Sequence, residues 1–208
     1  MPKVSAEHMQ ARRDQIVAAA IVCFAENGVH ATTMQDLCKE AKLSAGAVYL
    51  YFKSKEALIA AVAKQGQEMI QATLTELRAN SAPGGTLDEL VRVFSGLFTG
   101  DHPFYRQLGG KVTAQTLRRM NVMLRAEALR SPKVMAILAK NYARLQAAVT
   151  ELAAAAQAAG TTRRDIPPAA IAQSLNSLFI GLEAQLAYNP KLDVAAYVKA
   201  ARALIAAP

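Results

Sequence analysis

The sequence has little of several features that define other protein classes. Its 208 residues include two cysteines, three histidines and no tryptophan, and aromatic residues make up only 6%. Two cysteines exclude a disulfide framework, and three scattered histidines give no cluster with metal-ligand spacing. No run reaches the roughly eighteen apolar residues of a membrane-spanning helix. We therefore expect no metal, no cofactor and no membrane segment.

The motifs of common enzyme classes are also missing. There is no nucleophile elbow, no glycine loop for phosphates and no histidine close to a candidate nucleophile. Asp88 and Glu89 are adjacent, so they point to different sides of a helix and do not form a paired-carboxylate site. Cys23 and Cys38 fall at apolar positions of predicted helices, which favours buried structural thiols, with a redox switch as the alternative. We expect that the protein is not an enzyme.

The N-terminus superficially resembles a signal peptide, because basic residues precede the apolar run 16–25. Acidic Glu7 and Asp14 interrupt the basic region, and Glu26 begins a polar segment where a small-residue cleavage site is expected. The run also has the periodicity of a core helix. We therefore expect a cytoplasmic protein.

The chain has many alanines, a hydrophobic content of 52% and few β-branched clusters. This composition predicts an all-α fold. Caps, glycines and prolines divide it into about ten helices without a convincing strand. The main predicted helices are His8–Asn27, one beginning at Thr32, Ser44–Leu50, Ser54–Asn80, Thr86–Thr99, Lys111–Arg130, one from Ser131 to before Gly160, Ala169–Tyr188 and Val194–Ala206.

The stretch from Thr32 to Leu58 contains three of these helical patterns with two tight breaks. Thr32 and Gln35 have the spacing of a capping box. A three-residue turn, 41–43, then leads to Ser44, a good N-cap for the next helix. Two short helices joined by so short a turn indicate a helix-turn-helix, with a plain helical pair as the alternative.

Three details of this stretch favour DNA binding. Gly46 lies inside the second helix, where glycine costs about 1 kcal/mol relative to alanine, and Ala45 and Ala47 extend a nearly bare face. Tyr49 and Tyr51 place hydroxyls beyond that face, where they could donate to phosphates. Lys55 lies in the first turn of a helix, where the dipole disfavours a cation. A phosphate partner explains that charge.

The same stretch resembles the tetracycline-repressor (TetR) family of transcriptional regulators. The resemblance covers about the first sixty residues closely, and the remainder through length and helical character. It is carried by Ile16–Ala20 with Phe24 and Gly28, Thr32–Thr33, Leu43–Tyr49 and Phe52–Leu58. The resemblance implies a DNA-binding, ligand-responsive homodimer, but it does not identify the ligand.

Charge distribution does not add to the DNA argument. The net charge is +8, but residues 1–60 hold seven basic against six acidic residues, whereas residues 101–208 hold fourteen against six. The excess lies away from the helix-turn-helix, so the motif carries the prediction. Residues 111–144 contain eight basic residues and one acid, which indicates a solvated face or, alternatively, a site for an anionic ligand or acidic partner.

The predicted domains are a DNA-binding domain, 1–53, and a ligand-binding and dimerisation domain, 54–208, in which helix 54–80 connects the two. Small side chains recur at helical spacing on the helix from Ala169, which favours close helix packing. The family resemblance makes this stripe a dimer interface, with an intramolecular contact as the alternative. Its members are Ala170, Ser174, Ser177, Gly181 and Ala184.

Aromatic and polar residues of the second half are candidates for a ligand cavity, although side chains at such spacing are more often plain core. They are Phe94, Phe98, His102, Phe104, Tyr105, Asn121, Arg125, Phe179 and Glu183.

The sequence predicts a homodimeric repressor that binds a palindromic operator and is released by a small molecule. The alternative is a helical module that binds small molecules or proteins and has vestigial DNA binding. The predicted helix 44–50 has no Arg, Asn or Gln for bidentate base contacts. We therefore expect much of the specificity to come from DNA shape. The predicted DNA contacts are Thr33, Ser44, Ala45, Gly46, Ala47, Tyr49, Tyr51 and Lys55.

Overall fold

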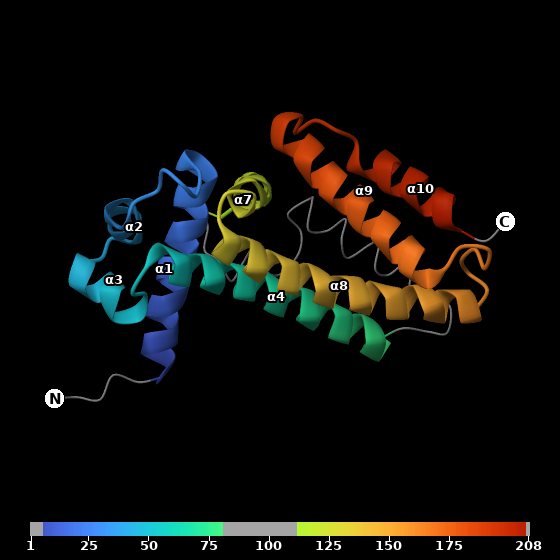
Figure 1. Ribbon diagram of the computed structural model, residues 1–208, viewed down its shortest axis with the longest axis horizontal. Coiled ribbons are helices and arrows are strands. Elements are labelled where there is room, and N and C mark those ends of the chain that lie inside the picture. Colours follow the sequence, from blue (N-terminus) through green and yellow to red (C-terminus); the bar gives the residue numbers. More distant parts are fainter. Residues whose placement is uncertain (1–5, 81–111, 207–208) are drawn as a thin grey trace. The chain divides into compact units, whose positions relative to one another are not determined.

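The computed structural model describes residues 6–80 and 112–206, and these residues form eight helices (Figure 1). The helices are α1 (Ala6–Asn27), α2 (Met34–Ala41), α3 (Ala45–Tyr51), α4 (Lys55–Asn80), α7 (Ala114–Ala128), α8 (Pro132–Ala158), α9 (Pro168–Tyr188) and α10 (Val194–Ile205). The predicted all-α fold is confirmed. None of the described helices is long and apolar enough to cross a membrane. The predicted helix 86–99 and the predicted linker 81–85 lie outside the described residues.

The chain packs as two units, each with its own internal contacts. The first comprises Met1–Gln65 and Pro103–Leu138, and the second comprises Gly66–His102 and Ala139–Pro208. This division follows packing, whereas the predicted boundary between residues 53 and 54 concerns function and stays a prediction. In the packing division, α7 belongs to the same unit as the predicted helix-turn-helix.

The first unit is built on α1, whose second half is buried almost completely from Ile16 to Ala25. Helices α2 and α7 both pack against α1. Large side chains that are fully buried fill this unit; they include Phe24, Leu37, Val48, Phe52 and Leu58. Burying each such side chain contributes about 1.5–3 kcal/mol. A common hydrophobic core therefore positions the three N-terminal helices.

Helix α7 begins at its N-cap Thr113, whose hydroxyl accepts a hydrogen bond from the backbone N–H of Thr116. It packs against α1 through a face on which Met120 and Leu124 are buried. The end of α1 lies near this helix, because the Sδ atom of Met123 is 3.9 Å from the position a Cβ would take on Gly28. Gly28 has φ +79°, so it is the C-cap that the sequence predicts.

In the part that the structure describes, the second unit comprises α4 from Gly66 onward, α8 from Ala139 onward, α9 and α10. Val149 and Leu152 of α8 pack on Ala172 of α9, and Leu182 and Leu186 of α9 pack toward α10. Apolar side chains thus join α9 to a neighbour on two sides. As the sequence predicts, α8 begins with proline after the N-cap Ser131, and α9 ends before Asn189.

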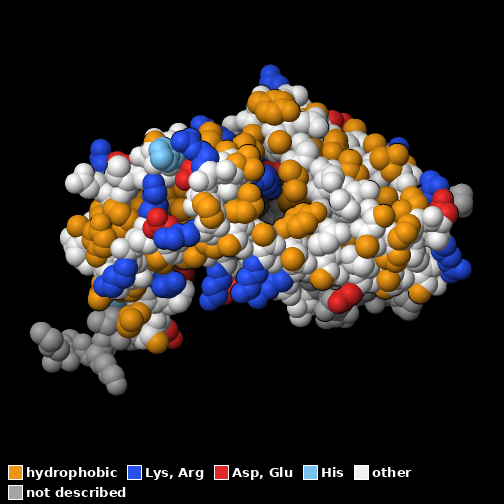
Figure 2. All heavy atoms as spheres, viewed as in Figure 1, with side chains coloured by type: hydrophobic (Ala, Val, Ile, Leu, Met, Phe, Trp, Pro, Cys, Tyr) orange, Lys and Arg blue, Asp and Glu red, His pale blue; other side chains and the backbone are white. Residues whose placement is uncertain are grey.

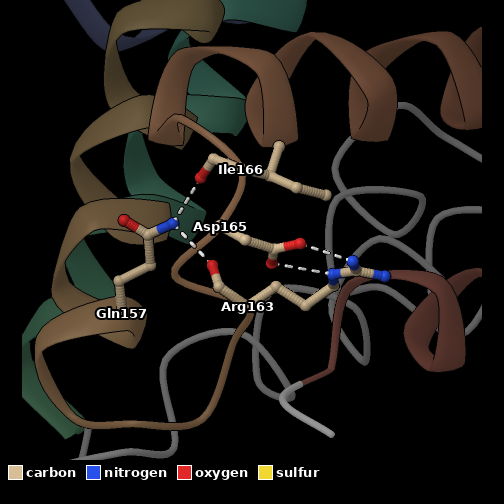
Figure 3. Close-up of polar contacts among 4 residues, drawn as sticks. All are labelled: Gln157, Arg163, Asp165 and Ile166. Atoms are coloured by element: carbon tan, nitrogen blue, oxygen red, sulfur yellow. Dashed lines mark hydrogen bonds and ion pairs between the residues drawn. The ribbon is translucent and has the colours of Figure 1, made fainter.

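Side-chain hydrogen bonds hold the loop between α8 and α9 (Figure 3), together with an isolated antiparallel β-bridge between Thr162 and Ala206. Gln157 donates from Nε2 to the carbonyl oxygens of Arg163 and Ile166, both at 2.6 Å. Arg163 and Asp165 form a two-bond ion pair, with N–O distances of 3.0 and 2.6 Å. The backbone N–H of Arg163 also donates to the carbonyl of Ile205. The loop therefore ties the end of α10 to the end of α8.

Candidate nucleic-acid interface

Helix α2 begins one residue later than the sequence predicts. Its N-cap is Thr33, whose hydroxyl accepts from the backbone N–H of Asp36 at 3.2 Å, and the Asp36 carboxylate accepts from the backbone N–H of Thr33 at 2.8 Å. The predicted capping box of Thr32 and Gln35 is therefore wrong. Hydrogen bonds from the Thr33 hydroxyl and backbone lower the pKa of Asp36. The carboxylate stays ionised, which also suits the helix dipole.

Thr32 has a different role, because its side chain is buried. Its hydroxyl lies 2.7 Å from the carbonyl oxygen of Gly28 and 3.2 Å from that of Cys23, and it donates to these acceptors at the end of α1. Only 1% of its surface is exposed. The Thr32 hydroxyl is thus directed toward the end of α1, and the hydroxyl that caps α2 is that of Thr33.

The turn between α2 and α3 is the one the sequence predicts. Lys42 ends α2 with φ 55° and ψ 41°, and its backbone N–H donates to carbonyls of the last turn of α2. The N–H of Leu43 donates to the carbonyl of Cys38 at 3.0 Å. This left-handed cap is commonly glycine, because other residues pay about 1 kcal/mol for it. The lysine here instead leaves an exposed cation at the turn.

Helix α3 is a short helix with one buried residue, Val48. Its N-cap is Ser44, whose hydroxyl accepts from the backbone N–H of Ala47 at 3.2 Å, as the sequence predicts. Ala45 and Gly46 are exposed, and Ala47 is half-buried. A Cβ added to Gly46 would meet no atom within 4 Å. The fold itself therefore does not require a glycine at this position.

The exposed face of α3 also contains Leu50, which is missing from the predicted DNA contacts. Leu50 is 69% exposed and Tyr49 is 42% exposed, whereas Tyr51 is half-buried. Leu50 follows Gly46 by four residues and Ala47 by three, so helical spacing places it on the same face. That spacing is the signal from which the sequence could have indicated it. In Figure 2 hydrophobic side chains over α2 and α3 are bordered by Lys and Arg side chains.

Lys55 begins α4 beside the N-cap Ser54 and makes hydrogen bonds within the protein. Its Nζ lies 2.8 Å from the carbonyl oxygen of His30 and 3.1 Å from that of Thr32. These carbonyls give a second reason for a cation at a helix N-terminus, besides the predicted phosphate. The phosphate contact stays a prediction. In the same turn the pKa of Glu56 is lowered, because its own backbone N–H and the Ser54 hydroxyl donate to it.

Two arginines of α1 make side-chain contacts within the first unit. The guanidinium of Arg13 lies over the ring of Phe52, 4.5 Å from its centre, in a cation–π contact. Arg12 donates to the side chain of Gln15 at 2.9 Å. Arg13 thus joins α1 to the end of α3, and the contact covers a core aromatic residue that is 1% exposed.

Both cysteines are free; the predicted burial is confirmed for Cys23, whereas Cys38 is half-buried. Cys23 is buried, and its Sγ lies 3.8 Å from the carbonyl oxygen of Asp36. Burial raises the pKa of the Cys23 thiol from 9.0 to about 11, and the nearby carboxylates of Glu40 and Asp36 add to the shift. A protonated thiol is a poor nucleophile. Cys23 therefore has a packing role between α1 and α2.

The predicted ligand residues fall in three parts of the chain. Phe94, Phe98, His102, Phe104 and Tyr105 lie outside the described residues. Asn121 and Arg125 are half-buried on α7 in the first unit, whereas Phe179 is half-buried and Glu183 is 3% exposed on α9 in the second. Arg118 of the basic stretch is also buried, so that stretch is not simply a solvated face. The predicted cavity stays a prediction. The described residues contain no cluster of His, Cys, Asp or Glu able to hold a metal.

The predicted stripe of small residues on α9 divides into two parts. Ala170, Ser174 and Ser177 are exposed. Gly181 and Ala184 are half-buried, and a Cβ on Gly181 would lie 3.9 Å from the hydroxyl of Tyr197 on α10. That hydroxyl donates to the carbonyl of Leu178 at 3.0 Å. The second part of the stripe therefore serves packing within the chain.

Comparison with protein families supports the resemblance to the TetR family that the sequence indicates. Residues 16–62 match the family described as "Bacterial regulatory proteins, tetR family". Residues 110–207 match "BetI-type transcriptional repressor, C-terminal". The first match contains the whole of α2, α3 and the turn between them. The two matches together cover most of the described helices.

Individual relatives extend the likeness over nearly the full length. The HTH-type transcriptional regulator UidR of Escherichia coli K12 is 29% identical over 196 residues, which are 94% of this chain and 92% of that protein. The HTH-type transcriptional repressor Rv1474c of Mycobacterium tuberculosis is 42% identical, but over 35% of this chain and 38% of its own length. The structure of Salmonella enterica GusR aligns with a TM-score of 0.74 and 28% identity, covering 97% of this chain and 96% of that one.

These families and relatives are regulators rather than enzymes, in agreement with the sequence prediction. The structure adds the capped helix pair, the left-handed turn and the exposed face of α3 that a helix-turn-helix needs to reach DNA. This protein belongs to the TetR family of transcriptional regulators.

Proposed function

We propose that the protein is a homodimeric repressor that binds a palindromic operator in the cytoplasm and is released by a small molecule. The observation that carries the proposal is the exposed face of α3. On it a Cβ at Gly46 would have no atom within 4 Å, and Leu50 is 69% exposed. A helix with a bare face and flanking hydroxyls fits the major groove.

The recognition chemistry of α3 is apolar. Ala45, Ala47 and Leu50 offer methyl groups, which suit contact with the methyl group of thymine. Tyr49 and Ser44 offer hydroxyls beside that face, and these suit phosphate oxygens. Two further residues would contact the phosphate backbone of the DNA. They are Tyr51, which is half-buried, and Thr33, which is the N-cap of α2. Because apolar contacts discriminate weakly, DNA shape would supply much of the specificity.

The dimer would form through exposed small residues of the second unit. Ala170, Ser174 and Ser177 are exposed on α9. Helix α8 also exposes small residues at helical spacing: Ala143, Ala147, Ala154 and Ala158. Small side chains let helices of two protomers approach closely. Gly181 and Ala184 would continue the interface as far as α10 leaves them accessible.

A small molecule would act through the second half of the chain, where the candidate ligand residues lie. The C-terminal match to a family described as a transcriptional repressor supports this assignment. Binding would favour a state in which the two recognition helices no longer fit successive major grooves.

The test is a selection from a random-sequence duplex library with the purified full chain, followed by footprinting at physiological salt. We expect a palindromic consensus bound by two protomers, with the mass of the complex measured by analytical ultracentrifugation. Substituting base pairs between the half-sites should also weaken binding. Failure to enrich any sequence would refute the repressor and favour a ligand-binding module with vestigial DNA binding.

A matched pair of tyrosine variants tests the assignment of α3. Tyr49→Phe removes one hydroxyl and should lower affinity for the selected duplex about fivefold. Tyr142→Phe makes the same change on exposed α8 and should leave affinity unchanged. Equal affinities for the two variants would remove Tyr49 from the interface.

A further inference from the structure

The ammonium group of Lys55 is turned into the protein rather than away from it. It donates to the carbonyl oxygens of His30 and Thr32, which belong to the loop between α1 and α2. The side chain is half-buried. Two hydrogen bonds from one cation, to acceptors 23 and 25 residues earlier in the chain, make a tertiary link between α4 and this loop.

The loop that Lys55 holds is itself a junction of helices. The Thr32 hydroxyl donates to carbonyl oxygens of Cys23 and Gly28, which fixes the loop to the end of α1. The next residue, Thr33, is the N-cap of α2. Lys55 therefore joins the first turn of α4 to the point where α1 ends and α2 begins.

The position of the recognition helix depends on this junction. Helix α3 follows α2 through a turn of fixed geometry at Lys42. The junction therefore constrains α2 at its first residue, and the turn passes that constraint to α3. Lysine has the reach and the donors to bind both carbonyls from the start of α4. Hydrogen bonds from a charged donor are about twice as strong as neutral ones.

We propose that Lys55 is a positioning residue for DNA binding. Its two hydrogen bonds hold the loop, and with it α2 and α3, in the orientation that enters the major groove, and this internal role outweighs any contact with phosphate. The inference rests on the proposed DNA-binding function. It assigns to Lys55 an indirect role that acts on specificity rather than on general attraction to DNA.

The first experiment measures hydrogen exchange of the free protein, without DNA. Lys55→Met keeps the length of the side chain but removes its donors and charge. Amides of residues 29–41 should exchange about tenfold faster in this variant. Lys53→Met removes an exposed lysine two residues earlier and should leave their exchange unchanged. Unchanged exchange in Lys55→Met would overturn the proposal.

The second experiment compares binding to the selected duplex and to a random duplex of equal length. The loss of a positioning residue should weaken binding to the selected duplex about tenfold, with binding to random DNA and the salt dependence nearly unchanged. The loss of a phosphate contact would instead weaken both and lower the salt slope by about one. That second pattern, which we expect of Lys53→Met if Lys53 meets phosphate, would overturn the proposal for Lys55.

The two experiments separate this inference from the function on which it rests. If the wild-type chain selects no duplex, the proposed function fails, while hydrogen exchange still measures the junction. Circular dichroism should show that Lys55→Met is folded. Should it unfold, Lys55→Gln keeps a donor of shorter reach and should show the same changes at smaller size; wild-type exchange and wild-type specificity in that variant would contradict the proposal.

Discussion

Helices α3 and α9 are held in place by different means. Helix α3 has seven residues and one buried residue, Val48. Helix α9 has 21 residues, and six of them are buried. An isolated helix shorter than about twelve residues is marginal in water. Because α3 has so little packing of its own, its caps and its turn determine its position, whereas α9 is held by packing along its length.

This difference explains where the sequence is informative. A helix that depends on caps needs particular residues at particular positions, such as Ser44 before α3 and the turn at Lys42. Helix α9 begins after Pro167 without a side-chain cap hydrogen bond, and many apolar sequences could pack in its place. The helix-turn-helix is therefore recognisable as a motif, and α9 is recognisable only as a helix.

The largest predicted effect comes from truncating one large core side chain in each unit. Phe52→Ala should cost about 3–5 kcal/mol, because Phe52 is 1% exposed and also packs against Arg13. Leu182→Ala in the second unit should cost about 2–5 kcal/mol. Urea unfolding gives both values, and hydrogen exchange should rise mainly in α1–α3 for Phe52→Ala and in α9–α10 for Leu182→Ala. Exchange that rises equally in both units for either variant would contradict the division into units.

The next effect concerns the buried hydroxyl at the junction. Thr32→Val keeps the shape of the side chain but leaves carbonyl oxygens of Cys23 and Gly28 with one donor fewer. It should lower the free energy of unfolding by about 1–3 kcal/mol. Thr33→Val, in contrast, removes an exposed cap and should cost about 1 kcal/mol. If Thr33→Val lowered the free energy of unfolding more than Thr32→Val does, the assignment of the buried hydrogen bond to Thr32 and of the exposed cap to Thr33 would be wrong.

A smaller effect comes from removing one helix cap in each region. Ser44→Ala removes the N-cap of α3. Asp193→Ala removes the N-cap of α10, because the Asp193 carboxylate accepts from the backbone N–H of Ala196 at 2.9 Å. Each should lower stability by about 1 kcal/mol. Only Ser44→Ala should weaken binding to the selected duplex, because only α3 depends on its cap to meet DNA. Equal DNA affinities for the two variants would show that α3 is positioned without Ser44.

The sequence predicts most of the first unit because its signals are local. The caps at Ser44 and Ser54, the turn at 41–43 and the C-cap Gly28 all follow from residue type and spacing, and the structure confirms them. The capping box is displaced by one residue, because two threonines are adjacent and only tertiary packing decides which is buried. Likewise, the sequence does not indicate that Lys55 reaches carbonyls 23 and 25 residues away.

The second unit is less predictable because its signals are not specific. Small residues on α9 predict close packing, but the pattern does not say against which helix. The structure places Gly181 beside Tyr197 of α10 and leaves Ala170 exposed, so one stripe serves two surfaces. Buried Glu183 has no local signal either, because burial of a charge depends on what surrounds it in three dimensions.

The last predicted change in stability is of similar size but has the opposite sign, and it tests the recognition helix most directly. Gly46→Ala should stabilise the protein by about 1 kcal/mol, because alanine favours helix and the new methyl group meets no atom within 4 Å. Gly66→Ala is a matched control in α4, where a Cβ also meets nothing within 4 Å. Both variants should gain similar stability in urea unfolding.

Their DNA binding should differ. If α3 approaches the groove wall as closely as its bare face suggests, the methyl group of Gly46→Ala will clash with DNA and lower affinity for the selected duplex about tenfold. Gly66→Ala should bind like the wild type. Gly46 weakens its own helix and is not needed by the free protein. Close contact with DNA would then explain why the residue is a glycine. Full affinity in the more stable Gly46→Ala would remove that explanation and leave Leu50 and Tyr49 to make the approach.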